Sequence, residues 1–149
     1  MRTIQREIVG AFIFSKNGKL LLGKNSKGGV YSGCWVIPGS GIEQGETDLE
    51  ALAREVSEEV GISIHDASVE LIRDDMTGES TKTLQETDEE VFVKMNFKTY
   101  KVVLSQPHST VDVICEEYFE SATWFDESEI TDLNLSPPTR VVLEYMGIV

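Results

Sequence analysis

Apolar runs alternate with short polar or glycine-containing segments along most of the chain. Residues 8–14 and 19–23 are strand-like apolar runs joined by the segment Ser15-Lys16-Asn17-Gly18. Its Asn-Gly pair can supply the two positive-φ residues that a tight hairpin requires. We therefore predict a hairpin here, followed by a loop at Gly28-Gly29 and a short strand over residues 34–37 that Pro38 ends.

The strongest helical pattern follows a glycine-rich loop at residues 39–45. Thr47 and Glu50 have the T-x-x-E spacing of a capping box, and Gly61 stands where a C-terminal cap belongs. Between them, apolar residues recur at about 100° per residue and predict one buried face; they are Leu49, Leu52, Ala53, Val56 and Val60. The pattern predicts a helix over about residues 48–60.

The second half of the chain has more strands than helices. We predict a strand near residues 69–73, a polar loop containing Gly78, a long alternating strand over about residues 91–98 and another over about 118–125. A short helix around residues 127–133 and a terminal helix starting near Pro138 complete the pattern. Helices interspersed among strands indicate an α+β fold, with a mixed sheet covered by helices on both faces. The 149 residues are expected to form a single domain, residues 1–149.

Charge narrows the classes of partner. The chain has 26 Asp+Glu against 13 Lys+Arg, a formal net charge of −13. Duplex nucleic acid and anionic membrane surfaces both need a basic face on the protein, so neither is expected as a partner. A small polyanion stays possible if metal ions supply the missing positive charge.

The cysteines and the apolar runs predict a compartment. Cys34 and Cys115 are too few for a disulfide framework and favour buried thiols in a reducing environment. The first residues enter a strand-like run without a signal-peptide core, and no apolar stretch approaches the roughly 18 residues of a membrane span. We expect a cytoplasmic protein that does not bind membranes.

Acidic residues concentrate around the predicted helix. Seven of the 26 lie between Glu43 and Glu59. Among them Glu55, Glu58 and Glu59 have i, i+3 and i+4 spacing, which places three carboxylates on one helix face. The cluster is either a solvated acidic surface or a set of oxygen ligands for Mg²⁺ or Mn²⁺. The clustering alone does not decide between them.

The loop and helix together resemble the Nudix box, G-x5-E-x7-R-E-U-x-E-E-x-G-U, where U is apolar. The matching residues are Glu46, Arg54-Glu55-Val56, Glu58-Glu59 and Gly61-Ile62, and the one departure is Ser40 at the first glycine, between Gly39 and Gly41. Residues 23–24, 35–38 and 122–125 extend the resemblance.

The chain is thus identified as a member of the Nudix superfamily. The resemblance implies an α/β/α sandwich and metal-dependent hydrolysis of a nucleoside diphosphate linked to another group.

The resemblance also implies roles for the box residues. Glu55 and Glu59 should bind Mg²⁺ directly, and Glu58 directly or through water. The Gly39 carbonyl is a further candidate ligand, and Arg54 should pair with Glu46 to hold the loop against the helix. The general base is either Glu55 or a carboxylate outside the box. The candidates outside it are Glu117 and Glu116, of which Glu116 is also a candidate metal ligand.

The substrate is expected to be a small nucleotide. Residues 29–35, 116–119 and 132–135, together with Trp124, are similar to bacterial Nudix nucleoside triphosphatases that prefer pyrimidine deoxynucleotides. This similarity implies conversion of a (d)NTP to (d)NMP and pyrophosphate. The candidate substrate-binding residues are Lys24 and Lys27 for phosphates, Tyr118, Phe119 or Tyr31 for stacking on the base, and Asn134 and Arg140 for base or phosphate contacts.

Two alternatives remain open at this stage. One is a MutT-like enzyme that removes oxidised purine nucleotides. The other is a non-catalytic Nudix-fold regulator that binds a nucleotide without cleaving it. The sequence leaves the oligomeric state open.

Overall fold

The computed structural model describes residues 1–25, 31–115 and 117–149. Its elements, in chain order, are β1 (Arg2–Phe14), β2 (Leu20–Lys24), β3 (Trp35–Val36), β4 (Gly39–Gly41), α1 (Asp48–Val60), β5 (Ser68–Thr83), β6 (Glu90–Val103), the 3₁₀ helix η1 (His108–Thr110), β7 (Ser121–Phe125), α2 (Glu127–Ile130) and α3 (Pro137–Tyr145). The Gly28-Gly29 loop predicted above lies outside the described residues. No helix in the described residues is long and apolar enough to cross a membrane.

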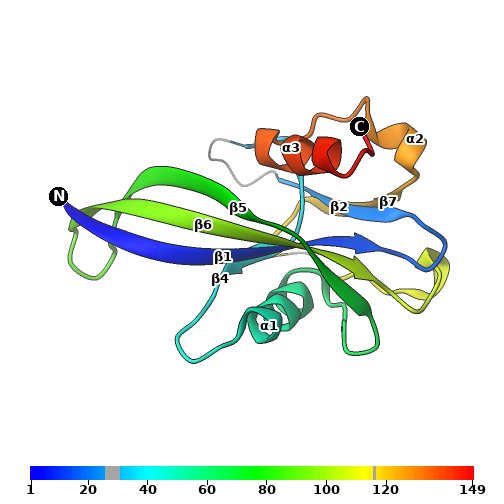
Figure 1. Ribbon diagram of the computed structural model, residues 1–149, viewed down its shortest axis with the longest axis horizontal. Helices are drawn as coiled ribbons and strands as arrows, with labels where there is room; N and C mark the ends of the chain where they lie inside the picture. Colours follow the sequence, from blue (N-terminus) through cyan, green and yellow to red (C-terminus); the bar gives the residue numbers. More distant parts are fainter. Residues whose placement is uncertain (26–30, 116) are drawn as a thin grey trace.

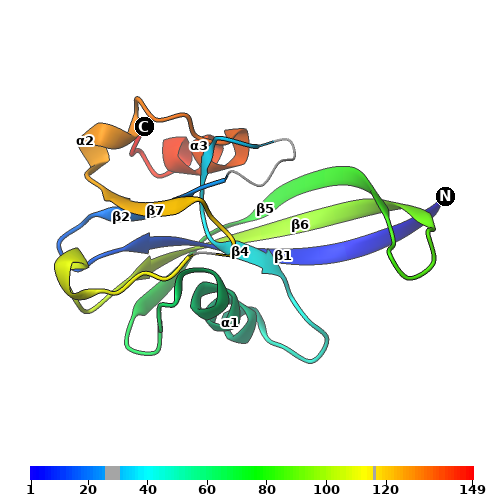
Figure 2. The same ribbon diagram turned by 180° about the vertical axis from the view of Figure 1, so that it is seen from behind.

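The sheet lies between two helical layers, with α1 on one face and α2 and α3 on the other (Figures 1 and 2). Its strand order is β3-β2-β1-β6-β5, with β4 paired to β1 and β7 paired to β2. The pairing of β1 with β6 is parallel, whereas the other strand pairs are antiparallel. The expected α+β architecture, a mixed sheet flanked by helices, is confirmed.

Each face of the sheet has its own apolar core. Successive residues of a strand point to opposite faces, so β1 contributes Val9, Ala11 and Ile13 to the α1 side and Phe12 and Phe14 to the α3 side. Both sets of side chains are buried. The central strand is therefore fixed from both faces, which makes it a rigid base for the segments paired to its edges.

Helix α1 has the predicted ends but a different buried face. Thr47 and Glu50 form the capping box, and Gly61 ends the helix in the left-handed conformation. Leu49, expected in the core, is 55% exposed, whereas the carboxylate-bearing Glu55 and Glu59 are buried. Compared with the predicted orientation, the helix is turned so that Glu55 and Glu59 face inward. Their carboxylates are held there by polar contacts, Glu55 with Arg54 and Glu59 with Gly39 of β4.

Two turn predictions need correction. The segment expected as an irregular loop at residues 39–45 begins as strand β4, which pairs with β1 through Val9 and Ser40. The hairpin between β1 and β2 forms as expected, but of its Asn-Gly pair only Gly18 has positive φ. Asn17 instead uses its side chain, which accepts hydrogen bonds from the Ser15 hydroxyl at 2.6 Å and from the His108 backbone N–H at 3.2 Å.

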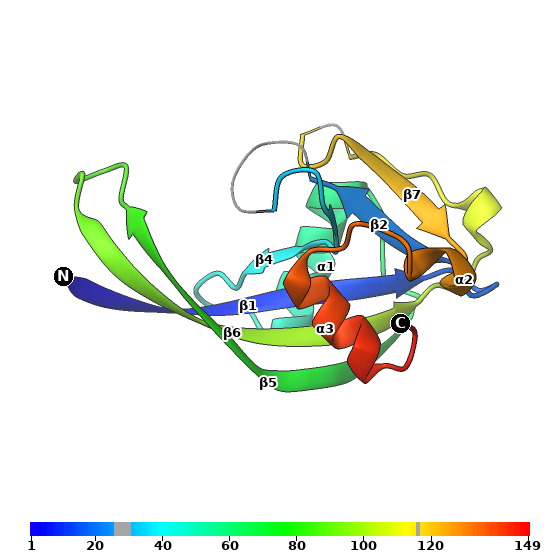
Figure 3. The same cartoon turned by 90° about the horizontal axis from the view of Figure 1, so that it is seen from above.

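Strands β1, β5 and β6 extend past the helices as a three-stranded arm (Figures 1 and 3). Gly78, predicted in a polar loop, lies within β5 and pairs with Met95. The loop prediction was wrong because residues 76–83 are held by backbone pairing to β6, while most of their side chains are exposed and carry no apolar pattern. Gly78 suits this place, since a Cβ there would lie 3.0 Å from the Phe97 ring.

Gly39 provides a test of how tightly β4 is held. Its φ is +154°, and a Cβ there would overlap the Val9 carbonyl and lie 2.6 Å from the Gly10 Cα. We expect Gly39→Ala to destabilise the protein by about 2–5 kcal/mol, since backbone strain and overlap with a buried strand add. Gly18→Ala, where φ is also positive but a Cβ meets no atom within 4 Å, should cost about 1–2 kcal/mol. Thermal unfolding compares the two; equal losses would contradict close packing at Gly39.

Candidate active site

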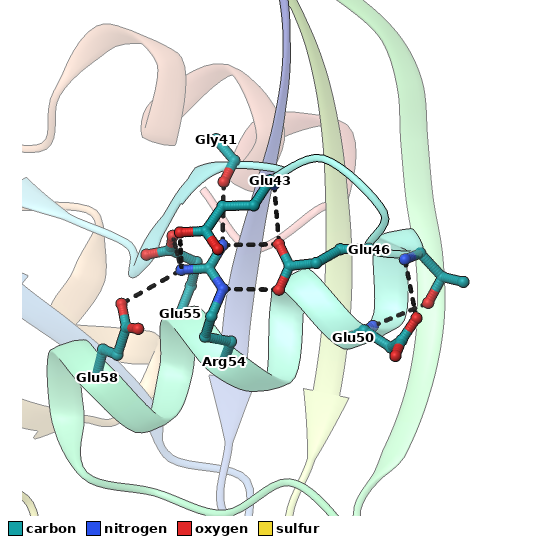
Figure 4. A network of polar contacts seen from close by, with 8 residues as sticks. Gly41, Glu43, Glu46, Glu50, Arg54, Glu55 and Glu58 are labelled. Atoms are coloured by element: carbon teal, nitrogen blue, oxygen red, sulfur yellow. Dashed lines mark hydrogen bonds and ion pairs between the residues drawn. The ribbon is translucent and has the colours of Figure 1, made fainter.

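The Arg54 side chain joins helix α1 to the loop that precedes it (Figure 4). Its Nε and Nη2 donate to the two carboxylate oxygens of Glu46 at 2.7 and 2.9 Å. Nη2 also donates to the Gly41 carbonyl at 3.2 Å, and Glu46 accepts the backbone N–H of Glu43 at 2.9 Å. These bonds fix the loop to the helix, and the guanidinium of Arg54 holds the pKa of Glu46 below its ordinary value.

The remaining nitrogen of Arg54 faces three more carboxylates. Nη1 lies 2.8 Å from Glu55, 3.3 Å from Glu58 and 3.7 Å from Glu43. The Glu55 side chain is 8% exposed and the Glu58 side chain 46% exposed, so one is held inside the site and the other opens to solvent. The Arg54 guanidinium thus forms ion pairs with four carboxylates. Its hydrogen bond to Glu46 is the main cause of the raised pKa of Arg54.

Glu59 lies on the same helix face but outside the reach of Arg54. Its Oε2 accepts the backbone N–H of Gly39 at 3.0 Å, which connects β4 to α1. Burial raises the pKa of Glu59 to about 9, helped by its hydrogen bond to Glu55 and by the charges of Glu55 and Glu58. The Gly39 N–H opposes this rise without cancelling it. Glu59 is therefore protonated at neutral pH in the metal-free protein.

These residues have the donor chemistry of a site for a hard divalent cation. Carboxylate and carbonyl oxygens are the ligands that Mg²⁺ and Mn²⁺ prefer. Within residues 1–25, 31–115 and 117–149, however, no three His, Cys, Asp or Glu side chains stand ready to hold a metal. Arg54 engages Glu55 and Glu58, and Gly39 engages Glu59. Binding a cation here would require Glu59 to lose its proton and Glu58 to turn away from Arg54.

The segment before β7 lies beside the carboxylates. Partial burial, followed by the charges of Glu58, Glu117, Glu59 and Glu55, raises the pKa of Tyr118 above its ordinary value. Glu117 and Tyr118, both predicted from this segment, are exposed, and Tyr118 lies close enough to the box glutamates to feel their charges. Glu116 lies outside the described residues.

The other predicted substrate residues have contacts elsewhere. Lys24 lies at the end of β2 with its Nζ 3.9 Å from Glu120, and Asn134 donates to the Gly33 carbonyl at 3.4 Å. Arg140, on α3, donates to the Leu133 carbonyl at 3.1 Å. Within the described residues, these contacts of Lys24, Asn134 and Arg140 do not reach the box carboxylates. Lys27 lies outside the described residues.

The aromatic candidates separate by exposure. Tyr31 and Tyr118 are exposed, whereas Phe119 is 6% exposed. A Cβ on Gly23 would lie 2.6 Å from the Phe119 ring, so this ring fills the space above a glycine of β2. The prediction that Phe119 stacks on a base was wrong, because its ring is part of the core.

Sequence reasoning missed three backbone or loop contacts of the site. The Gly41 carbonyl and the Glu43 carboxylate both face Arg54, and the Gly39 N–H binds Glu59. Backbone donors and acceptors are present at every residue, so sequence gives no signal for the first and third. The acidity of the loop was the signal available for Glu43.

Comparisons with known proteins agree with this arrangement. A family model described as NUDIX domain matches residues 4–146. The chain is 30% identical to a protein named nucleoside triphosphatase NudI from Enterobacter sp. (strain 638), over 97% of this chain and 98% of the relative. Among solved structures it resembles the Nudix hydrolase RenU of M. smegmatis, with a TM-score of 0.69 and 16% identity, over 97% of this chain and 85% of RenU. It also resembles the MutT protein of Methanosarcina mazei Go1, with a TM-score of 0.62 and 19% identity, over 99% of this chain and 95% of that protein.

The raised pKa of Glu59 predicts a pH dependence of stability in the metal-free protein. The unfolded chain releases this proton near pH 4.5, but the folded protein keeps it to about pH 9. The folded state therefore loses stability as pH rises through this window, with a slope of up to about 1.4 kcal/mol per pH unit. Glu59→Gln should remove this slope and raise the melting temperature at pH 8.

Thermal unfolding with a chelator between pH 5 and 9 measures the effect. Glu50→Gln makes the same charge change at an exposed capping residue of α1 and serves as the control. Parallel pH profiles for the wild type and Glu59→Gln would contradict the prediction.

Proposed function

Because this chain belongs to the Nudix family of hydrolases, we propose that it hydrolyses a nucleoside triphosphate to the nucleoside monophosphate and pyrophosphate. The observation that carries the proposal is the Arg54-centred carboxylate cluster, joined through Gly39 and Gly41 to β4. Four carboxylates share Arg54 there and a fifth, Glu59, lies beside them, which suits a site completed by cations and a phosphate chain. The full-length match to a relative named as a nucleoside triphosphatase supports the substrate class.

We propose Mg²⁺ as the cofactor, with Glu55, Glu58, Glu59 and the Gly39 carbonyl as its ligands. The Gly39 N–H donates to Glu59, so the backbone of this residue lies beside the cluster. When bound, the cation neutralises phosphate charge and polarises the P–O bonds that react. Glu43, Glu46, Glu55, Glu58 and Glu59 against Arg54 leave an excess of four negative charges if all are ionised.

The protein's own residues orient the reactants. In the proposed reaction one water adds its oxygen to phosphorus at a bridging phosphoanhydride, the P–O bond to pyrophosphate breaks, and a proton leaves the water. We assign the proton to Glu55, because Arg54 holds this buried carboxylate in one orientation beside Glu59. Arg54 itself acts as a positioning residue, since its bonds fix Glu46, Glu55 and the loop.

The first test is a pyrophosphate-release assay with dNTPs, oxidised dNTPs, ADP-ribose and nucleotide sugars, with and without Mg²⁺. We expect a dNTP to be the best substrate and a chelator to abolish turnover, which Mg²⁺ should restore. Turnover of oxidised purine dNTPs far above normal ones would favour the MutT-like alternative. If no compound is cleaved with metal present, the hydrolase proposal fails and nucleotide binding without cleavage becomes the better description.

Amide substitutions on α1 test the residue roles. We expect Glu55→Gln to lower kcat by about 10²–10⁴-fold, the usual range for loss of a general acid–base group, and Glu59→Gln to weaken activation by Mg²⁺. Glu50→Gln is the matched control on the same helix and should keep wild-type activity, because it belongs to the exposed capping box. Glu117→Gln should change kcat by less than about tenfold; a loss like that of Glu55→Gln would move the base to Glu117.

A further inference from the structure

Arg6, on β1, contacts the same glycine as Arg54 does but has no carboxylate of its own. Gly41 is buried, and a Cβ there would overlap the Arg6 guanidinium and lie 2.9 Å from its Cζ. The guanidinium therefore lies against the backbone of β4 at Gly41. Within the described part of the chain, Arg6 has no hydrogen bond or ion pair, although it is exposed and the site beside it is strongly acidic.

Strand β4 separates Arg6 from the carboxylates. Its inner edge pairs with β1, where Ala11 and Ile42 donate to the carbonyls of Pro38 and Glu7. Its outer edge faces α1, where the Gly39 N–H binds Glu59 and the Gly41 carbonyl binds Arg54. Arg6 lies against the face of β4, so a chain of phosphates leaving the carboxylate cluster across Gly41 would pass its guanidinium.

Neighbouring charges give Arg6 no other role. Glu7, next to it in β1, accepts from Asn96 at 3.1 Å, and Glu43 faces Arg54. Across the parallel ladder Arg6 is paired with Met95, and beyond it lies Gly78, so its row carries no acidic side chain on β6 or β5. Two guanidinium groups thus contact one glycine, and only one of them is neutralised by the protein.

We propose that Arg6 binds non-bridging oxygens of the substrate's phosphate chain, an inference that rests on the proposed function. The planar guanidinium presents paired N–H donors that match two phosphate oxygens, and its charge is uncompensated until an anion arrives. Gly41 is required for this arrangement because any side chain there would displace the guanidinium. The contact is with phosphates and not with the base, so it should act alike on all nucleotides.

The test compares Arg6→Ala and Arg6→Gln with Arg2→Ala. Arg2 lies on the same strand and the same face, and its guanidinium pairs with Glu89 at 2.9 and 3.2 Å at the far end of the arm. For both Arg6 variants we expect KM for each of the four dNTPs to rise by about tenfold or more, by the same factor, with kcat changed much less. Arg2→Ala should keep wild-type values. All variants should unfold at wild-type temperatures, and Arg6→Gln, which keeps a planar group, serves if Arg6→Ala does not fold.

Binding of inorganic pyrophosphate in the presence of Mg²⁺, measured by calorimetry, gives a readout independent of turnover. Its Kd should rise by a similar factor in both Arg6 variants and stay unchanged in Arg2→Ala. Unchanged KM and pyrophosphate affinity would overturn the proposal, and so would a loss confined to one base with normal pyrophosphate binding. If the wild type cleaves no nucleotide, the proposed function fails, while the pyrophosphate comparison still decides the role of Arg6.

Discussion

The bidentate pairing of Arg54 with Glu46 is the interaction on which the site depends. Without it the glutamates of α1 would repel one another more strongly at i, i+3 and i+4 spacing, and the loop would lose its two shortest side-chain hydrogen bonds to the helix. A lysine could not replace it, since a single ammonium cannot serve a forked carboxylate, a carbonyl and two further carboxylates in fixed directions. Arg54 thus holds α1 and β4 together, with the Glu59 carboxylate adding a second contact at Gly39.

The same cluster accounts for much of the chain's acidity. Residues 43–59 carry seven acids and one arginine, which is −6 of the total −13, and the remaining 19 acids and 12 bases leave −7. Arg54 and Lys98, which pairs with Asp48, neutralise only part of this local excess. Burial together with the neighbouring Glu55 and Glu58 raises the pKa of Glu59. If Mg²⁺ binds here as proposed, its binding must displace the Glu59 proton, so metal binding and protonation are coupled.

How much could be predicted from sequence differs between elements. Helix α1 was predicted to the residue at both ends, because its capping box and its C-terminal glycine are local signals. The arm was predicted only in part, since β5 and β6 are stabilised there by pairing between strands whose exposed side chains have no apolar period. The rotation of α1 that exposes Leu49 depends on what packs against it, which no single segment encodes. In the site, the pairing of Arg54 with Glu46 formed as expected. The contacts of the Gly39 N–H and the Gly41 carbonyl could not be predicted, because they depend on how β4 packs against α1.

The long parallel ladder between β1 and β6 has a consequence for how the chain folds. Its paired residues are 89 positions apart in sequence, as for Glu7 and Asn96, and the ladder runs along the whole of β1. Residues 2–7 of β1 pair with β6 alone among the described strands, so this part of the sheet forms only after most of the chain has been synthesised. Contacts of such large sequence separation slow folding, because the chain loses the entropy of loop closure before the hydrogen bonds of the ladder form and compensate for it. Arg2, Gln5 and Glu7 lie in this late-pairing part of β1. Their charged and polar side chains disfavour association of the unpaired strand edge with another chain.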